Sequence, residues 1–270
     1  MSSDAEQQTR VSPCTAGYHP VVLCSDGALG APGRAPFDRI IATCGIDRVP
    51  TDWITQLAPA GAILANVSKG IVLLRDTDTT SARAVSGRFL GGAGFMPLRS
   101  DSQHYTPRSP VTDVLHATGG PGPNATDTAA DATVAGPDMT TTVITHPQLD
   151  REFALAAFLT GLLADRSQLV YTHAGADPTG PVNSYRWLHP ATGSWARVDL
   201  PNPTNQQPGQ LTATVRQAGS RRLWDELQPA LHAWHRASRP DLTHWGLTVT
   251  DTGHHQLWLD EPTATVANLR

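Results

Sequence analysis

Short apolar, β-branched runs alternate with polar stretches rich in glycine and proline through the first part of the chain. Runs of this kind, bounded by turn residues, are typical of buried strands. A short helix is expected after Pro50, where Thr51 or Asp52 supplies a cap and Trp53, Ile54 and Leu57 share an apolar face. The expected strands are His19–Cys24, Phe37–Thr43, Ala62–Val67, Gly70–Arg75 and Gly94–Leu98.

The order strand, helix, strand between Phe37 and Val67 is the rhythm of a βαβ unit. Parallel strands need such a crossover, whereas a tight turn can join only antiparallel neighbours. We therefore expect an α/β fold with a parallel, doubly wound sheet in this part of the chain.

The pattern changes between residues 117 and 142, where small residues, proline and aspartate replace bulky apolar side chains. This composition is typical of a flexible linker. Amphipathic helices are expected at Leu149–Leu163 and Arg221–His235. We expect a partial domain at 1–116, a linker at 117–142 and an α+β domain at 143–270. The last two strands of the α+β domain are expected to form a hairpin. Its expected strands are 168–172, 184–188, 194–198, 211–215, 245–250 and 256–260.

Charge and cysteine content narrow the functional classes. The 270 residues include 24 acidic and 20 basic side chains, a net charge of −4, so nucleic acid is not an expected partner. Cys14, Cys24 and Cys44 fit neither a disulfide framework nor a zinc site, which favours a reducing compartment. The polar, acidic N-terminus does not resemble a signal peptide, and no apolar stretch approaches the roughly 20 residues of a membrane helix. We expect a cytoplasmic protein without a membrane partner.

Five pieces of sequence follow one another in the N-terminal part of the chain. They are Ala16-Gly17-Tyr18, Asp26-Gly27, Ala35-Pro36-Phe37-Asp38-Arg39-Ile40-Ile41-Ala42-Thr43, Val49-Pro50 with Trp53, and Gln56-Leu57-Ala58-Pro59-Ala60-Gly61. In order and spacing they resemble the central stretch of protein-L-isoaspartate O-methyltransferases. In that family a Gly-Asp-Gly turn, an Ala-Pro-Tyr/Phe-Asp strand and a helix ending in Leu-x-Pro-Gly-Gly succeed one another. Each piece is weak alone, but five in register make the resemblance fairly specific.

The resemblance implies a Rossmann-like sheet, the cofactor S-adenosylmethionine, and methyl transfer to an isoaspartyl or side-chain carboxylate of a protein or peptide. Looser similarities suggest an actinobacterial-type branch of the family. Its members carry an extra C-terminal domain, and some of these proteins modify ribosomally made peptides. These similarities lie at Gly87–Leu90, Gly94–Arg99, Leu223–Glu226, Trp245–Val249 and Leu257–Asp260.

The cofactor residues implied by the resemblance are Asp26, Gly27, Thr43 and Cys44. In open α/β sheets ligands bind beyond the carboxyl ends of strands, where the Asp26 carboxylate could accept a hydrogen bond from the adenine amine. Gly27 would let the backbone approach a flat ring. The alternative is a simple Asp-Gly turn, and Thr43 and Cys44 could equally be packing residues. Asp38 is interpreted as an edge or capping residue, and the catalytic residues stay unassigned.

The chain departs from the family's pattern at one decisive place. The glycine loop that should bind the cofactor, with its strand and helix, would precede Asp26, but Gly17 is the one glycine in that stretch. The later cluster Gly91-Gly92-Ala93-Gly94 leads to Pro97, which disfavours a helix there. We therefore expect an N-terminally truncated sheet that lacks its first strands. A late start of the sequence, a partner that supplies the missing part and a decayed remnant all remain open.

Histidines and tryptophans in the C-terminal part offer two further candidate sites. His232, His235, His254 and His255 could bind a metal, but no carboxylate or cysteine spacing supports this, and no metal is expected. The later tryptophans could line a peptide groove, although most are more simply core residues.

The leading hypothesis is a methyltransferase that acts on a protein or peptide, impaired in cofactor binding as the sequence stands. The alternative is a non-enzymatic peptide-binding module or remnant.

Overall fold

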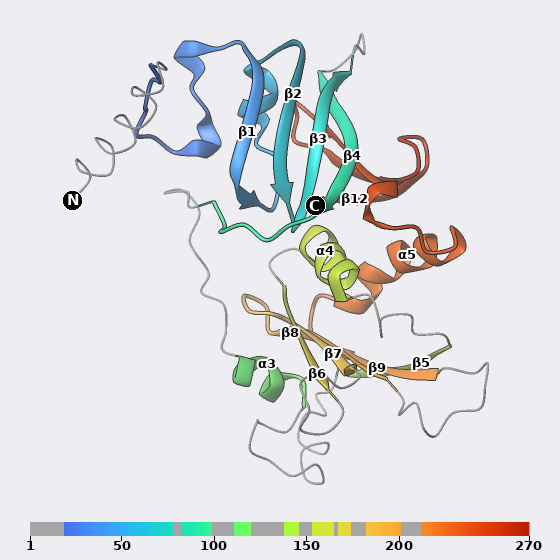
Figure 1. The fold of residues 1–270 in the computed structure, drawn as a ribbon. Coiled ribbons are helices and arrows are strands. Elements are labelled where there is room, and N and C mark those ends of the chain that lie inside the picture. The colour runs from blue at the N-terminus through green and yellow to red at the C-terminus, as the bar shows by residue number, and fades with distance from the viewer. Residues whose placement is uncertain are drawn as a thin grey trace.

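Two β-sheets with two helices between them form the described part of this computed structural model (Figure 1). The structure describes residues 19–77, 83–98, 111–119, 138–145, 153–164, 167–173, 182–200 and 212–269.

Seven strands form the first sheet, in the order β1-β2-β3-β4-β10-β11-β12. The crossover through helix α2 (Thr51–Thr55) makes β1 and β2 parallel, while all other neighbours in this sheet are antiparallel. The strands are β1 Phe37–Ile46, β2 Leu57–Val67, β3 Gly70–Thr77, β4 Ala84–Gly92, β10 Trp245–Thr250, β11 His255–Leu259 and β12 Thr265–Leu269.

The expected α/β class is confirmed, and so is the parallel pair β1–β2, but the expectation of a wholly parallel sheet is wrong. Ser68 and Lys69 both have positive φ, 47° and 68°, and form a two-residue turn between β2 and β3. A turn of this kind can join only antiparallel strands.

Two predicted strands are also wrong. Residues 19–24 run as coil beside the short 3-10 helices η1 (Gly27–Leu29) and η2 (Pro32–Arg34). In the predicted strand Gly94–Leu98, Pro97 alone makes a bridge, to Gly45, whereas the strand lies earlier as β4. Proline cannot donate to a ladder, which accounts for the isolated bridge.

The C-terminal strands complete the first sheet. β10 pairs with β4, from Gly246 opposite Arg88 to Thr250 opposite Ala84, and β11 and β12 follow. The first sheet therefore extends across the boundary expected at residue 143. The expected linker overlaps the end of helix α3 (Val111–Ala117) and the start of strand β5 (Thr140–Thr145), and residues 120–137 lie outside the described part. The domain division itself stays a prediction.

The second sheet is antiparallel throughout, in the order β5-β9-β8-β7-β6. Helix α3 (Val111–Ala117) contacts β6 and β7, where Val114 packs with Leu188 and Trp195. The strands are β5 Thr140–Thr145, β6 Gln168–His173, β7 Val182–His189, β8 Ser194–Asp199 and β9 Thr212–Ala218.

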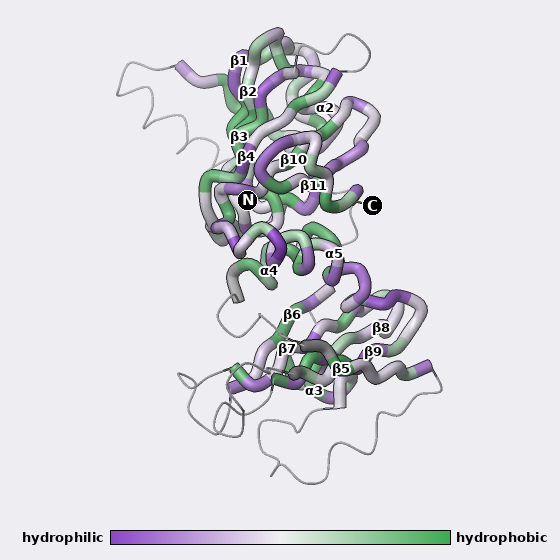
Figure 2. Tube along the Cα trace, turned by 90° about the vertical axis from the view of Figure 1, so that its right-hand side faces the viewer, coloured by the Kyte–Doolittle hydropathy of each residue, from purple (hydrophilic) through white to green (hydrophobic). Residues whose placement is uncertain are grey.

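Helices α4 (Phe153–Leu163) and α5 (Leu223–Arg236) lie between the two sheets (Figure 2). On the first sheet, the ring of Phe158 meets Phe89 edge-on at 4.7 Å, and the hydroxyl of Ser68 donates to the Phe158 carbonyl at 2.8 Å. On the second sheet, the indole of Trp187 donates to Thr160 Oγ1 at 2.8 Å. Both sheets therefore share one continuous core.

Candidate functional site

Helix α2 holds the loop that carries Asp26 and Gly27. The Trp53 indole donates to the Gly27 carbonyl at 2.9 Å, although Trp53 is itself buried in the core. Asp26 Oδ1 accepts the Ala28 N–H at 2.9 Å and so caps η1. Asp26 and Gly27 therefore form the turn that the alternative interpretation expected, and the Ala28 N–H holds the Asp26 carboxylate in a defined position.

Gln56 is the second support of this loop. Its buried side chain accepts the Ala31 N–H at 2.8 Å and donates to the Leu29 carbonyl at 2.9 Å, while its own carbonyl accepts the Phe37 N–H. Gly30 has φ +65°, and a Cβ there would lie 2.5 Å from Gln56 Oε1. This close approach requires glycine, so the loop has one tightly defined path from η1 to β1.

The end of β1 carries Thr43 and Cys44 and is joined to the segment around Pro97. Gly45 N–H donates to the Met96 carbonyl, and Leu98 N–H donates to the Gly45 carbonyl, both at 2.8 Å. A Cβ on Gly27 would lie 3.4 Å from Leu98 Cδ1. The Leu98 side chain therefore lies beside Gly27, while its backbone is bonded to the carboxyl end of β1.

An apolar surface follows the outer edge of this site. β1 is the first strand of its sheet, and Ile41 on it is 65% exposed. Phe95 and Met96, beside the end of the strand, are 46% and 82% exposed. An edge strand with exposed apolar side chains is a surface on which further strands can pair.

The Cys44 thiol is half-buried on β1. Burial raises its pKa above the usual value, so the neutral thiol predominates near neutral pH.

His255 ties the C-terminal hairpin to the entrance of α2. Its Nε2 accepts the Val49 N–H at 3.0 Å, and its Nδ1 lies 2.9 Å from the Gly253 carbonyl, which makes Nδ1 the donor. Burial lowers the pKa of His255 to about 4, so the ring is neutral. The sequence analysis considered His255 together with three other histidines as a possible metal site and expected no metal there. Among the described residues, no group of three histidine, cysteine, aspartate or glutamate side chains is arranged to hold a metal.

The sequence analysis missed Trp53, Gln56 and Leu98 as residues that position the site. Trp53 and Gln56 belong to the sequence pieces that carry the resemblance, but their hydrogen bonds to residues 27–31 have no local signal. Leu98 comes close to Gly27 because residues 93–98 cross the end of β1. A pattern of apolar residues does not reveal that path.

Comparison with known proteins finds a family similarity in the N-terminal part of the chain. The profile of the family "Protein-L-isoaspartate(D-aspartate) O-methyltransferase" matches residues 5–103. This part of the chain is similar to the protein-L-isoaspartate O-methyltransferase family. The match contains Asp26, Gly27, Thr43, Cys44 and the supporting residues Trp53, Gln56 and Leu98, and it ends before the second sheet.

Curated relatives named protein-L-isoaspartate O-methyltransferase are similar to the same part of the chain. That of Methanopyrus kandleri is 34% identical over 89 residues, which are 33% of this chain and 39% of the relative. That of Methanosarcina mazei is 43% identical over 84 residues, 31% of this chain and 35% of the relative. The chain thus spans well under half the length of these relatives. A solved structure titled protein-L-isoaspartate O-methyltransferase overlaps 97% of this chain and 66% of its own, with a TM-score of 0.44 and 14% identity.

No helix within the described ranges is long and apolar enough to cross a membrane.

Proposed function

We propose that this protein is an S-adenosylmethionine-dependent O-methyltransferase that acts on a carboxylate of a protein or peptide, of the isoaspartyl or aspartyl type. The family match over residues 5–103 carries the proposal. It is supported by the held loop at Asp26-Gly27 and by its contact, through Leu98, with the carboxyl end of β1. The sparse cysteines support a cytosolic location.

The described residues fit the adenine end of the cofactor. Asp26 supplies a carboxylate that the Ala28 N–H holds in place in the loop before η1, although no strand precedes it in the described part of the chain, and Leu98 supplies an apolar surface beside Gly27. Thr43 and Cys44 would line the path from the adenine toward the transferred methyl group. A carboxylate that accepts from an exocyclic amine in such a partly dry crevice contributes about 1.5–3 kcal/mol.

The remaining part of the cofactor needs a strand, glycine loop and helix beside β1. We propose that this unit pairs along the edge of β1 at Ile41, where the described sheet ends and apolar surface is exposed. When bound, S-adenosylmethionine supplies a methyl group on a positively charged sulfur, which a carboxylate oxygen can attack directly. No covalent enzyme intermediate is needed, which agrees with the protonated thiol of Cys44.

A transfer assay tests this proposal. The chain is joined at its N-terminus to the family's strand, glycine loop and helix and is incubated with labelled S-adenosylmethionine and an isoaspartyl peptide. We expect base-labile methyl ester on the isoaspartyl peptide and none on a peptide with asparagine at that position. Equal labelling of both peptides, or none with a folded chain that binds the cofactor, would contradict a carboxylate substrate.

The second candidate function is a peptide-binding module without catalysis. It is favoured by one observation, that the whole second sheet lies beyond the family match. A folded, extended chain with no measurable cofactor affinity that still binds peptides would support the module over the enzyme.

A further inference from the structure

Three arginines lie directly opposite one another across neighbouring strands of the second sheet. Arg186 on β7 pairs with Arg197 on β8, and Arg197 pairs with Arg216 on β9. Residues in register on adjacent strands share a face, so the three side chains form a row, called here the arginine row. Like charges placed directly opposite repel one another, and in this row Asp199 offsets part of that repulsion by pairing with Arg197 and Arg216.

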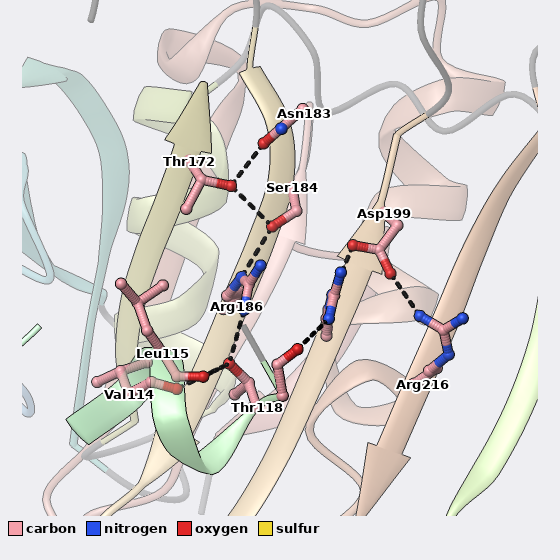
Figure 3. A network of polar contacts seen from close by, with 11 residues as sticks. Val114, Leu115, Thr118, Thr172, Asn183, Ser184, Arg186, Asp199 and Arg216 are labelled. Carbon is pink, nitrogen blue, oxygen red and sulfur yellow. Dashed lines mark hydrogen bonds and ion pairs between the residues drawn. The ribbon is translucent and has the colours of Figure 1, made fainter. Parts of the chain in front are cut away.

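Hydrogen bonds hold the inner end of the row rigidly. Arg186 is only 4% exposed, and its Nε donates to Ser184 Oγ at 2.9 Å. Its Nη1 lies 3.4 Å from Thr118 Oγ1, which in turn donates to the Val114 carbonyl at 2.7 Å. Figure 3 shows this chain of contacts from Ser184 through Arg186 to Thr118 at the end of α3.

The outer end of the row is partly accessible. Asp199 lies between two arginines, 2.5 Å from Arg197 Nε and 2.8 Å from Arg216 Nη1 (Figure 3). The side chains of Arg197, Arg216 and Asp199 are 16%, 28% and 24% exposed. Arg197 Nη1 also donates to the Gly119 carbonyl at 2.6 Å, so the guanidinium groups are oriented before any ligand arrives.

We propose that the arginine row binds an acidic segment of polypeptide through carboxylate–guanidinium pairs. Arginine presents a planar fork that matches a carboxylate, and both outer guanidinium groups are held in fixed orientations. Arg186 is buried, so the arginines open to a ligand are Arg197 and Arg216, on adjacent strands about 4.8 Å apart. Carboxylates two positions apart on one face of an extended peptide lie about 6.6 Å from one another, so one carboxylate can meet each guanidinium at the end of its long side chain.

The charge pattern favours a peptide over nucleic acid. Asp199 lies between Arg197 and Arg216 at the outer end of the arginine row, where it would repel a continuous run of phosphates. Carboxylates that are separated along a peptide can contact the arginine on each side of it. That the acidic peptide is a substrate rests on the proposed function, whereas the binding itself does not.

Fluorescence anisotropy without cofactor tests the binding directly. The probe is a labelled ten-residue peptide in which aspartate alternates with serine, and its partner has asparagine in place of aspartate. We expect the wild type to bind the aspartate peptide, less tightly as salt is added, and not the asparagine peptide. Binding of both peptides or of neither would overturn the proposal, and so would displacement of the probe by an oligothymidine at equal charge.

Two substitutions with opposite expected signs separate docking from a structural role. Arg216→Gln should weaken peptide binding about fivefold, as expected for a partly exposed ion pair. Asp199→Asn should tighten binding, because it removes the carboxylate that competes for both outer arginines. A purely structural network predicts weaker binding from both changes. Arg236→Gln, the same change of charge on exposed α5, is the matched control and should leave binding unchanged.

Folding is checked for every variant by thermal unfolding. If Arg216→Gln does not fold, Arg216→Lys keeps the charge but removes the fork, and it should still weaken binding several-fold. Unchanged affinity in the folded Arg216 variant, or an equal loss in Arg236→Gln, would refute the assignment. Because no methyl transfer is measured, these outcomes are independent of the proposed catalytic activity.

Discussion

The buried ring of His255 makes the stability of this protein depend on pH. The ring accepts the Val49 N–H and donates to the Gly253 carbonyl, and burial lowers its pKa to about 4 from an ordinary value of 6.5. The unfolded chain therefore binds a proton at a higher pH than the folded chain does. The stabilisation is fully present above pH 6.5, is lost as the pH falls toward 4, and changes no further below that.

The size of the effect follows from the same two values. One pH unit of difference corresponds to about 1.36 kcal/mol, so the difference between 6.5 and about 4 amounts to about 3 kcal/mol. We expect the free energy of unfolding to fall by this amount between pH 7 and pH 4, beyond the contribution of other groups. Urea unfolding at a series of pH values measures it.

His255→Gln isolates the contribution of this residue. Glutamine does not titrate, so the variant should be less stable at pH 7 but should lose about 3 kcal/mol less than the wild type on acidification. His235→Gln, on the exposed face of α5, is the control and should keep the wild-type slope. Parallel pH profiles for wild type and His255→Gln would refute a buried neutral ring.

Three further predictions concern hydrogen bonds that hold the site and the core. Gln56→Leu should lower the free energy of unfolding by about 2–4 kcal/mol and increase amide exchange at residues 28–31, because the buried amide satisfies Ala31 N–H and the Leu29 carbonyl; unchanged exchange there would contradict this role. Gly30→Ala should cost about 1–3 kcal/mol, measured by urea unfolding, since φ is +65° and the new Cβ displaces Gln56 Oε1; Gly33→Ala, where nothing lies near, is the control. Thr160→Val should cost about 1–3 kcal/mol by leaving the Trp187 indole unpaired, whereas Thr160→Ser should restore most of it.

Local pattern predicted much of the secondary structure because strands and amphipathic helices depend on nearby residues. The pair β1–β2 with α2 between them was expected, as were α5, β7, β8 and the β10–β11 hairpin. Strands β2 and β3 were both expected, but their antiparallel pairing was not. The turn between them has positive φ at Ser68 and Lys69 without the usual glycine or asparagine.

Long-range pairing was beyond the sequence pattern. Nothing near Trp245 indicates that β10 will pair with β4, because that register depends on packing of the whole first sheet around α4. His255 is similar, since a His-His pair after Asp251-Thr252-Gly253 resembles an exposed turn. Its burial becomes visible only when Val49 is brought against it from the other end of the sheet.

The candidate site was predicted in its parts but not in its construction. Asp26-Gly27 and Thr43-Cys44 came from the resemblance, and the roles assigned to them stay predictions. The residues that bring these parts together, Gln56 and Leu98, act through contacts across loops. Such contacts depend on the fold and leave no periodic signal in the sequence.

The most direct test of the proposed function is a calorimetric titration of S-adenosylmethionine into the chain joined to the family's strand, glycine loop and helix. Micromolar affinity is expected for the parent. Asp26→Ala should weaken it about ten- to a hundredfold, since a hydrogen bond to a charged group contributes about 1.5–3 kcal/mol. Asp38→Ala, exposed on β1, should leave the affinity unchanged. A folded Asp26→Ala protein that binds the cofactor as tightly as its parent would contradict the account and leave Asp26 as a turn residue alone.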